Sequence, residues 1–291
     1  MLNGVPLGND NHVYFAAGAY ILKYNYFMQK NALSVAILTY NSQQYLATIL
    51  GKLTGVADEI LLLDSGSTDE TMAIGQRFGC VLARRKLDDF KTQRQYALDS
   101  CAYDYVLMID SDEIPNEAFV LHLQTLKKTG FAHAGYTLER HWNVLGKSVA
   151  SIYPVVNPDF PLRLIDRRCY NFKTCNRVHE EPRGTGSLSK LNGAVQHITF
   201  ETEAILQQKL HRYTDIAAQD LLDRCKNRSS LKPSISSLKP YISAFAAFGK
   251  WFFFKKGWKD GLTGIRLGYY AAQYSFFKYK KAKQILESDF K

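Results

Sequence analysis

The sequence predicts an α/β fold, in which a mixed sheet is flanked by helices and followed by a helical, basic and aromatic C-terminal extension. From Leu33 onward, short apolar runs alternate with segments whose apolar residues recur at helical spacing, which is typical of a sheet built from βα units. Small polar or acidic residues follow the strongest runs, and lysines alternate with aromatic rings after residue 240. With 291 residues and 46% hydrophobic composition, the chain can bury one large core and carry a smaller module.

The first half of the chain supplies the clearest elements. In chain order, the pattern predicts strands at 34–39, 59–63, 81–83 and 105–109 and helices at 43–53 and 89–100. Gly66 permits a tight turn after the second strand. Ser67 and Glu70 then predict a capping box at the start of the next helix.

The second half divides into three stretches. Between 136 and 197 the apolar runs shorten and Gly, Pro and Asn become frequent, which predicts antiparallel strands and long loops. A long helical segment then reaches about Arg228, and a Ser, Pro and Lys linker follows at 229–240. We therefore expect an N-terminal extension at 1–31, a catalytic domain at 32–228 and a C-terminal helical region at 229–291.

Charge and cysteine usage narrow the partners and the compartment. The formal net charge of +10 favours polyanionic partners, such as nucleic acid, anionic lipid or phosphorylated sugars. The five scattered cysteines form no CxxC pair, so we expect them to be reduced and the protein to be cytosolic. No positively charged region precedes the short apolar stretch near Ala16, so we expect no signal peptide.

Polar and acidic residues follow three predicted strands, at 39–41, 64–69 and 110–113. In a parallel sheet these ends share one edge, where ligands bind. Asp110 and Asp112 are two residues apart, so they can share one divalent cation whose other ligands are diphosphate oxygens. The alternative is structural, because Asp112 and Glu113 can also cap a helix that begins near Asn116.

The order of these motifs supports a named resemblance. TYN after the first strand, DSGSTDET after the second and DSDE after the third resemble a family 2 inverting glycosyltransferase of the GT-A fold, which has a Rossmann-like sheet. FKTQRQYAL and VHEEP resemble the branch that contains lipopolysaccharide inner-core β-1,4-glucosyltransferases. The resemblance covers residues 33 to 285. Two departures, Ser42 after TYN and Ser65 in the DSGS turn, replace acidic residues often found there.

The resemblance implies roles for individual residues. Thr39, Tyr40 and Asn41 would line the nucleoside pocket, and Asp64 would hold the uracil or its ribose. Asp110 would lie near the ribose and the metal. Asp112 would be the main ligand of Mg²⁺ or Mn²⁺. His197 would complete the metal shell, or it is a core histidine with satisfied hydrogen bonds.

Further candidates come from spacing and charge. Lys91 and Arg94 share one face of a predicted helix, where they can reach the diphosphate or simply face solvent. Inversion requires a carboxylate to take the proton of the acceptor hydroxyl, and Glu180 or Glu181 can serve. We prefer Glu180, because the family-like motif is HE. The alternative is a surface ion-pair cluster with neighbouring arginines.

The C-terminal region interleaves rings with lysines between 241 and 280, a composition that suits a membrane interface. No apolar run approaches the roughly 20 residues that span a bilayer, so we expect the chain to lie on the membrane. The alternative is that these rings pack on the catalytic domain or on a partner subunit. Stacking on single-stranded nucleic acid is a further use of such rings, but no nucleic-acid-binding motif supports it.

The function we expect from this resemblance is transfer of a sugar, with glucose from UDP-glucose as the donor. The acceptor would be a heptose or another hydroxyl of a lipopolysaccharide-core or other glycolipid, met on the cytoplasmic face of the inner membrane. A nucleotidyltransferase is the first alternative, although the chain lacks a Gly-rich loop after its first strand. A non-catalytic protein that binds membranes or nucleic acid on the same scaffold is the second.

Overall fold

The computed structural model describes residues 13–14, 31–152, 155–174, 181–228 and 235–288. The chain forms two compact units. Residues 1–141 and 160–197 belong to the first unit, and residues 142–159 and 198–291 belong to the second. Most of the predicted N-terminal extension and the preferred base Glu180 lie outside the described residues.

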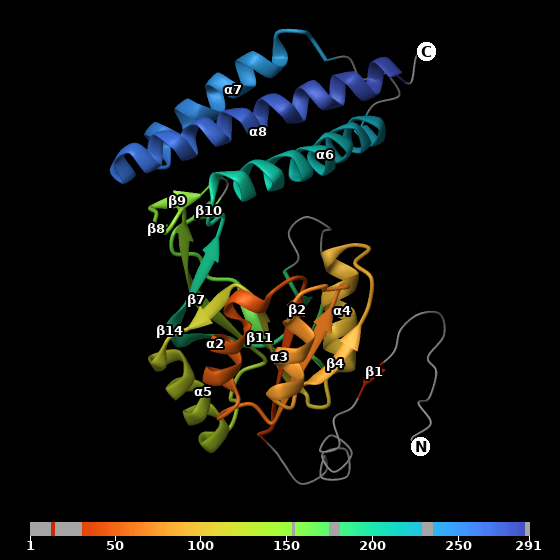
Figure 1. Cartoon of the computed structure of the whole chain (residues 1–291), viewed down its shortest axis with the longest axis vertical. Helices are drawn as coiled ribbons and strands as arrows, with labels where there is room; N and C mark the ends of the chain where they lie inside the picture. The colour runs from red at the N-terminus through yellow and green to blue at the C-terminus, as the bar shows by residue number, and fades with distance from the viewer. Residues whose placement is uncertain (1–12, 15–30, 153–154, 175–180, 229–234, 289–291) are drawn as a thin grey trace. The chain divides into compact units, whose positions relative to one another are not determined.

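The first unit is built on a mixed sheet, which confirms the predicted fold class. Its parallel half has the order β4-β3-β2-β5, and each of the four predicted strands is present (Figure 1). These strands are β2 (Leu33–Thr39), β3 (Glu59–Asp64), β4 (Val81–Arg84) and β5 (Tyr105–Asp110). A two-residue strand, β1 (Val13–Tyr14), pairs with β4. Thr39 pairs with Asp64, and Leu38 pairs with Asp110, so the three polar strand ends meet at one edge, as predicted.

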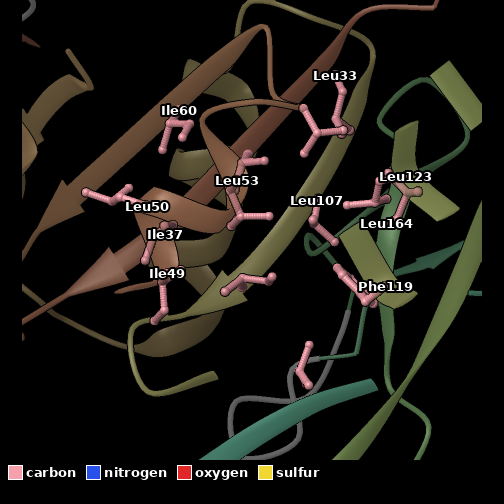
Figure 2. Close-up of a cluster of buried hydrophobic side chains, with 14 of the residues drawn as sticks. Leu33, Ile37, Ile49, Leu50, Leu53, Ile60, Leu107, Phe119, Leu123 and Leu164 are labelled. Atoms are coloured by element: carbon pink, nitrogen blue, oxygen red, sulfur yellow. The ribbon is translucent and has the colours of Figure 1, made fainter. Parts of the chain in front are cut away.

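Helices cover both faces of this sheet because the strands alternate their side chains between them. Leu33 and Ile37 of β2 pack in one core with Leu50 of α2 (Gln43–Leu53) and Phe119 of α5 (Glu117–Thr129) (Figure 2). Ile74 of α3 (Thr71–Arg77) belongs to the same core. The other face packs against α4 (Phe90–Ser100).

The second half of the sheet is antiparallel, as predicted for residues 136–197. The order continues as β5-β11-β7-β14-β6. Its strands are β6 (Glu113–Pro115), β7 (Gly135–Val144), β11 (Leu162–Asp166) and β14 (Leu188–Thr199). The register of β14 on β6 sets His197 opposite Glu113. A small pair, β12 (Tyr170–Asn171) and β13 (Arg183–Gly184), completes this unit.

Two local predictions about helix starts need correction. The capping box of Ser67 and Glu70 is wrong, because Glu70 makes no side-chain cap and the Ser67 hydroxyl donates to Asp64 instead. The structural alternative for Asp112 and Glu113 is also wrong. Helix α5 is capped by Asn116, whose side chain accepts from the Phe119 N–H, and Glu113 lies in β6.

The second unit is helical, with a small β element. Short strands β8 (Lys147–Ser148), β9 (Ser151–Ile152) and β10 (Val155–Val156) form in residues 142–159. The long helix α6 (Glu203–Arg228) comes next. It is followed by α7 (Lys239–Gly249), the π-helix η2 (Lys250–Phe254), the 3₁₀-helix η3 (Gly257–Asp260) and α8 (Gly261–Ser288). Both α6 and α7 pack along α8 (Figure 1). In the described part of the chain, no helix is long and apolar enough to cross a membrane.

The core of the second unit joins residues far apart in sequence. Val144 and Val149 pack with Trp251, Leu267 and Ala271. Asp260 accepts the Ala150 N–H with both carboxylate oxygens. Helix α6 belongs to this unit, whereas the predicted boundary between 228 and 229 lies after that helix. The ranges 32–228 and 229–291 stay a prediction about a catalytic and a membrane-associating region.

Gly193 offers a test of the packing between β14 and α5. Its φ is +81°, and a Cβ there would meet the backbone of Ala118 and Phe119. Gly193→Ala should therefore lower the free energy of unfolding by about 2 kcal/mol or more, measured by urea titration. Gly51→Ala, on an open face of α2, should leave stability unchanged or raise it by up to about 1 kcal/mol. Equal midpoints for the two variants would contradict this packing.

Candidate functional site

Two turns at the carboxyl edge of the sheet are joined by Asp64. Its carboxylate is fully buried, and it accepts from the Thr39 hydroxyl at 3.2 Å and from the Gly66 and Ser67 N–H groups at 2.9 Å. These donors come from both the TYN and the DSGST segments. Asp64 therefore holds the TYN and DSGST segments together, and its contact with uracil or ribose stays a prediction.

The TYN segment carries an exposed ring beside a strained residue. Tyr40 is 63% exposed, so its ring is open to a ligand. Asn41 adopts a positive φ of 49°, and its side-chain oxygen accepts the Thr68 N–H at 2.9 Å. Left-handed backbone outside glycine is costly and often found at functional sites. Tyr40 and Asn41 therefore stand where a nucleoside pocket was predicted, with Thr39 buried behind them.

The two serines that depart from the family pattern have partners of their own. The Ser42 hydroxyl lies 2.8 Å from the Ser111 hydroxyl, so it joins the TYN segment to the DSDE segment. Ser65 accepts from the Gln93 amide of α4 at 3.2 Å. Both replacements thus tie the three strand-end segments and α4 together by neutral hydrogen bonds.

A buried network of charges fixes the DSDE segment. Asp110 binds Arg94 at 2.8 Å through one carboxylate oxygen and Arg163 at 3.0 Å through the other. Glu113 is fully buried, accepts the Asp110 N–H at 3.0 Å, and binds Arg140 at 2.8 Å and Arg163 at 3.4 Å. Arg94 comes from α4 and binds Asp110, while Arg140 of β7 and Arg163 of β11 bind Glu113.

The network changes the acidity of Asp110. Burial alone would raise its pKa, but the Arg94 and Arg163 guanidiniums outweigh burial and hold this pKa well below its usual range. Burial also lowers the pKa of the Arg163 guanidinium, which Asp110 and Glu113 partly offset. Asp110 is therefore an anion at neutral pH, with both oxygens already bound to arginines.

Asp112 and His197 form a pair at the edge of this network, where the His197 Nδ1 lies 3.9 Å from a Glu113 carboxylate oxygen. The His197 Nε2 lies 3.3 Å from the Asp112 carboxylate, which is one-third exposed. Burial would lower the pKa of His197, but the Asp112 and Glu113 carboxylates outweigh burial and raise it above the usual value. This pairing is compatible with both interpretations of His197 drawn from the sequence. A metal ligand and a core histidine with satisfied hydrogen bonds would each lie beside Asp112.

Asp112 and His197 supply two of the donors that a cation site requires. Among the described residues, no group of three or more His, Cys, Asp or Glu side chains is arranged to hold a metal. Asp112 and His197 offer one oxygen and one nitrogen donor next to each other. Divalent cations that act on nucleotides are commonly held by one or two protein ligands together with phosphate oxygens. Two donors fit a site of that kind, whereas Asp110 is committed to arginines.

The remaining predicted residues are placed unevenly. Arg94 is buried on α4 against Asp110, so its role in the structure is to hold the DSDE segment. Lys91 lies one turn earlier on the same helix and is half-buried. Glu181 is exposed just before β13, while Glu180 lies outside the described residues.

Sequence reasoning missed Arg140 and Arg163, and it treated Glu113 only as part of a motif. The two arginines lie on strands whose register is set by long-range pairing, so nothing local in the sequence shows that they meet Glu113. One available signal was the position of Arg163 between Leu162 and Leu164, because a charged residue inside an apolar strand requires a buried partner.

The mixed sheet and the three strand-end segments agree with the GT-A fold expected from the sequence. Residues 34–147 match the family described as Glycosyl transferase family 2. This match to residues 34–147 agrees with the resemblance drawn from TYN, DSGSTDET and DSDE.

Several curated proteins are similar along most of the chain. The lipopolysaccharide core biosynthesis glycosyltransferase LpsC of Rhizobium meliloti is 27% identical over 273 residues, which cover 88% of this chain and 93% of that protein. An uncharacterized glycosyltransferase of Rickettsia conorii is 22% identical over 276 residues, covering 89% and 95%.

Two solved structures show a partial likeness. TarS residues 1–349 of S. aureus is 13% identical, with 89% of this chain and 92% of that chain covered and a TM-score of 0.38. Glucosyl-3-phosphoglycerate synthase of Mycobacterium tuberculosis, in complex with Mn²⁺, UDP and glucosyl-3-phosphoglycerate, is 22% identical. That comparison covers 39% of this chain and 44% of that chain, with a TM-score of 0.33.

The buried network predicts a large effect at Glu113. Glu113→Gln should lower the free energy of unfolding by about 3 kcal/mol, because it removes the buried negative charge that Arg140 and Arg163 share. Glu117→Gln, on the exposed first turn of α5, should cost no more than about 0.5 kcal/mol. Urea titration of both variants measures the difference, and a similar loss in each would refute the network's importance.

Proposed function

We propose that this glycosyltransferase moves glucose from UDP-glucose, with inversion at the anomeric carbon, to a heptose or another hydroxyl of a lipopolysaccharide-core or related glycolipid acceptor. The observation that carries the proposal is the meeting of the TYN, DSGST and DSDE segments at one sheet edge, with Asp112 beside His197. The family 2 match over residues 34–147 and the similarity to LpsC support the reaction class and the kind of acceptor.

In this proposal the donor binds across the carboxyl edge of the sheet. Tyr40 and Asn41 contact the nucleoside, and Thr39 and Asp64 support them from below. Lys91 contributes positive charge near the diphosphate from α4. Asp110 orients the ribose of the donor, while Arg94 and Arg163 hold the Asp110 carboxylate in place.

Asp112 and His197 would hold Mg²⁺ or Mn²⁺, with Asp110 close behind them. When bound, such a cation neutralises charge that develops on a departing diphosphate. The chain's own part is to present one carboxylate oxygen and one imidazole nitrogen in a fixed arrangement. The buried Glu113 network provides that fixity, because it anchors the segment on both sides of Asp112.

The transfer itself is a single displacement. The acceptor oxygen forms a bond to the anomeric carbon as the bond from that carbon to the diphosphate oxygen breaks, and UDP leaves with the electron pair. A carboxylate takes the hydroxyl proton, and we assign this role to Glu180, with Glu181 as the alternative. An α-linked donor then gives a β-linked product.

The acceptor also suggests where the enzyme works. A glycolipid is presented at a bilayer surface, and the net charge of +10 favours an anionic one. We therefore propose a cytoplasmic protein that is peripheral on the cytoplasmic face of the inner membrane.

Asp112→Asn tests the cation assignment. The substitution keeps the shape but removes the charge, so we expect Mn²⁺-dependent UDP release to fall on the order of a hundredfold or more. Asp99→Asn, on the exposed side of α4, should retain full activity. Unchanged turnover in the Asp112→Asn variant would remove this residue from the site.

The reaction class is tested by UDP release from a panel of UDP-sugars, with and without Mn²⁺, using lipopolysaccharide that lacks its outer core. We expect turnover of UDP-glucose only when the cation is present. Glu180→Gln should lose turnover on the order of a hundredfold while donor binding persists, and Glu181→Gln should lose much less. Release of pyrophosphate would indicate a nucleotidyltransferase, and no nucleotide-sugar binding would indicate a non-catalytic protein.

A further inference from the structure

The helical second unit contains a hairpin whose closed end is unusually apolar at its surface. Helices α7 and α8 run antiparallel, since the Tyr241 ring lies 5.2 Å from that of Phe276 while Phe248 and Trp251 contact Gly268. The hairpin therefore closes through η2 and η3. We call residues 253–262 at this closed end the tip.

Four large apolar side chains of the tip face outward. Their exposed fractions are 68% for Phe253, 83% for Phe254, 54% for Trp258 and 78% for Leu262. Soluble proteins expose single apolar side chains routinely, but four within ten residues form an apolar patch of the kind that binds a membrane, a protein or a ligand. Tyr241, Ile242 and Phe245 extend the exposed apolar surface along α7.

The tip is firmly held from within. Trp251 is 1% exposed, and its indole N–H donates to the Gly264 carbonyl oxygen at 3.1 Å. Gly264 leaves no room for a side chain against the Gly257 carbonyl, so the two backbones approach closely. Lys256 turns the chain with a φ of +59°. Because Trp251, Gly257 and Gly264 pack closely, the backbone of the tip is fixed in a conformation that exposes the outward side chains.

The charge around these rings identifies the occupant. Lys256 and Lys259 are exposed in the tip, and Lys259 lies 5.7 Å from the Trp258 ring. The one acidic residue of the tip, Asp260, is turned to the Ala150 N–H. Residues 239–288 contain ten basic and two acidic side chains, a formal charge of +8. Apolar rings surrounded by lysines match a bilayer interface with anionic headgroups.

We propose that the tip, residues 253–262, inserts its four apolar side chains into the headgroup region of an anionic phospholipid bilayer while its lysines bind the headgroup phosphates. The inference rests on the membrane location in the proposed function and gives it a contact surface. It assigns the exposed rings to lipid, while Trp251 and Leu267 serve the core.

Co-sedimentation of the full chain with vesicles tests the assignment. We expect binding to vesicles of phosphatidylglycerol and phosphatidylcholine and little binding to phosphatidylcholine alone. Phe253→Ser combined with Phe254→Ser should weaken partitioning on the order of tenfold or more. Lys256→Gln combined with Lys259→Gln should weaken it on the order of tenfold at low salt. Leu121→Ser and Lys128→Gln, both on exposed positions of α5, should bind like the parent.

Fluorescence keeps the test independent of how the double variants fold. Trp258 is the most exposed of the three tryptophans, so anionic vesicles should shift the parent's emission to shorter wavelength, and Trp258→Phe should abolish the shift. No shift in the parent, or variants that bind as the parent does, would overturn the proposal. A parent that sediments as a dimer without lipid, and becomes a monomer when Phe253 and Phe254 are replaced, would show that a second copy covers the tip instead.

The same preparations separate this inference from the transfer reaction. UDP release in the absence of vesicles should be equal in the parent and the tip variants, because the tip lies in a different unit from Asp112. Vesicle binding without any donor turnover would refute the transfer and leave the tip assignment intact. Donor turnover without vesicle binding would refute the tip assignment alone.

Discussion

The buried ion network around Glu113 is the interaction on which the site depends. One carboxylate with no exposed surface holds two arginines and a backbone N–H, and the neighbouring Asp110 holds Arg163 and a third arginine. Charges of this kind are costly to bury and become favourable only when every partner is present. The DSDE segment is thereby fixed between α4, β7 and β11, and Asp112 is its most exposed carboxylate, at 33% against 24% for Asp110. Glu113, Arg140 and Arg163 thus order the centre of the site, although we assign none of them a contact with a substrate.

The parallel half of the fold was predictable because each of its strands is a continuous apolar run ending in polar residues. Runs such as 34–39 and 105–109 bury both faces of a strand, so composition alone identifies them. The meeting of their ends followed from parallel topology. The capping box failed for a different reason: the DSGST turn has several competing acceptors, and Asp64 takes the hydroxyl that the sequence pattern assigned to a helix start.

The antiparallel half and its contribution to the site could not be obtained in this way. Arg140 and Arg163 meet Glu113 only because β7 and β11 adopt one register with a bulge between Leu162 and Leu164. A shift of one residue would turn each side chain to the other face. His197 was found through its strand-like surroundings and the family resemblance, and its register opposite Glu113 explains why it reaches Asp112.

The path of the chain between the two units has a consequence for inheritance and engineering. The chain passes from one unit to the other after residues 141, 159 and 197. Val144 and Val149, which belong to the core of the second unit, therefore lie in a segment inserted between two parts of the first unit. A C-terminal region exchanged between relatives by a single crossover would arrive without those residues. Recombinants that keep residues 142–159 and 198–291 from the same parent preserve that core. The two segments, although distant in sequence, therefore have to be exchanged together.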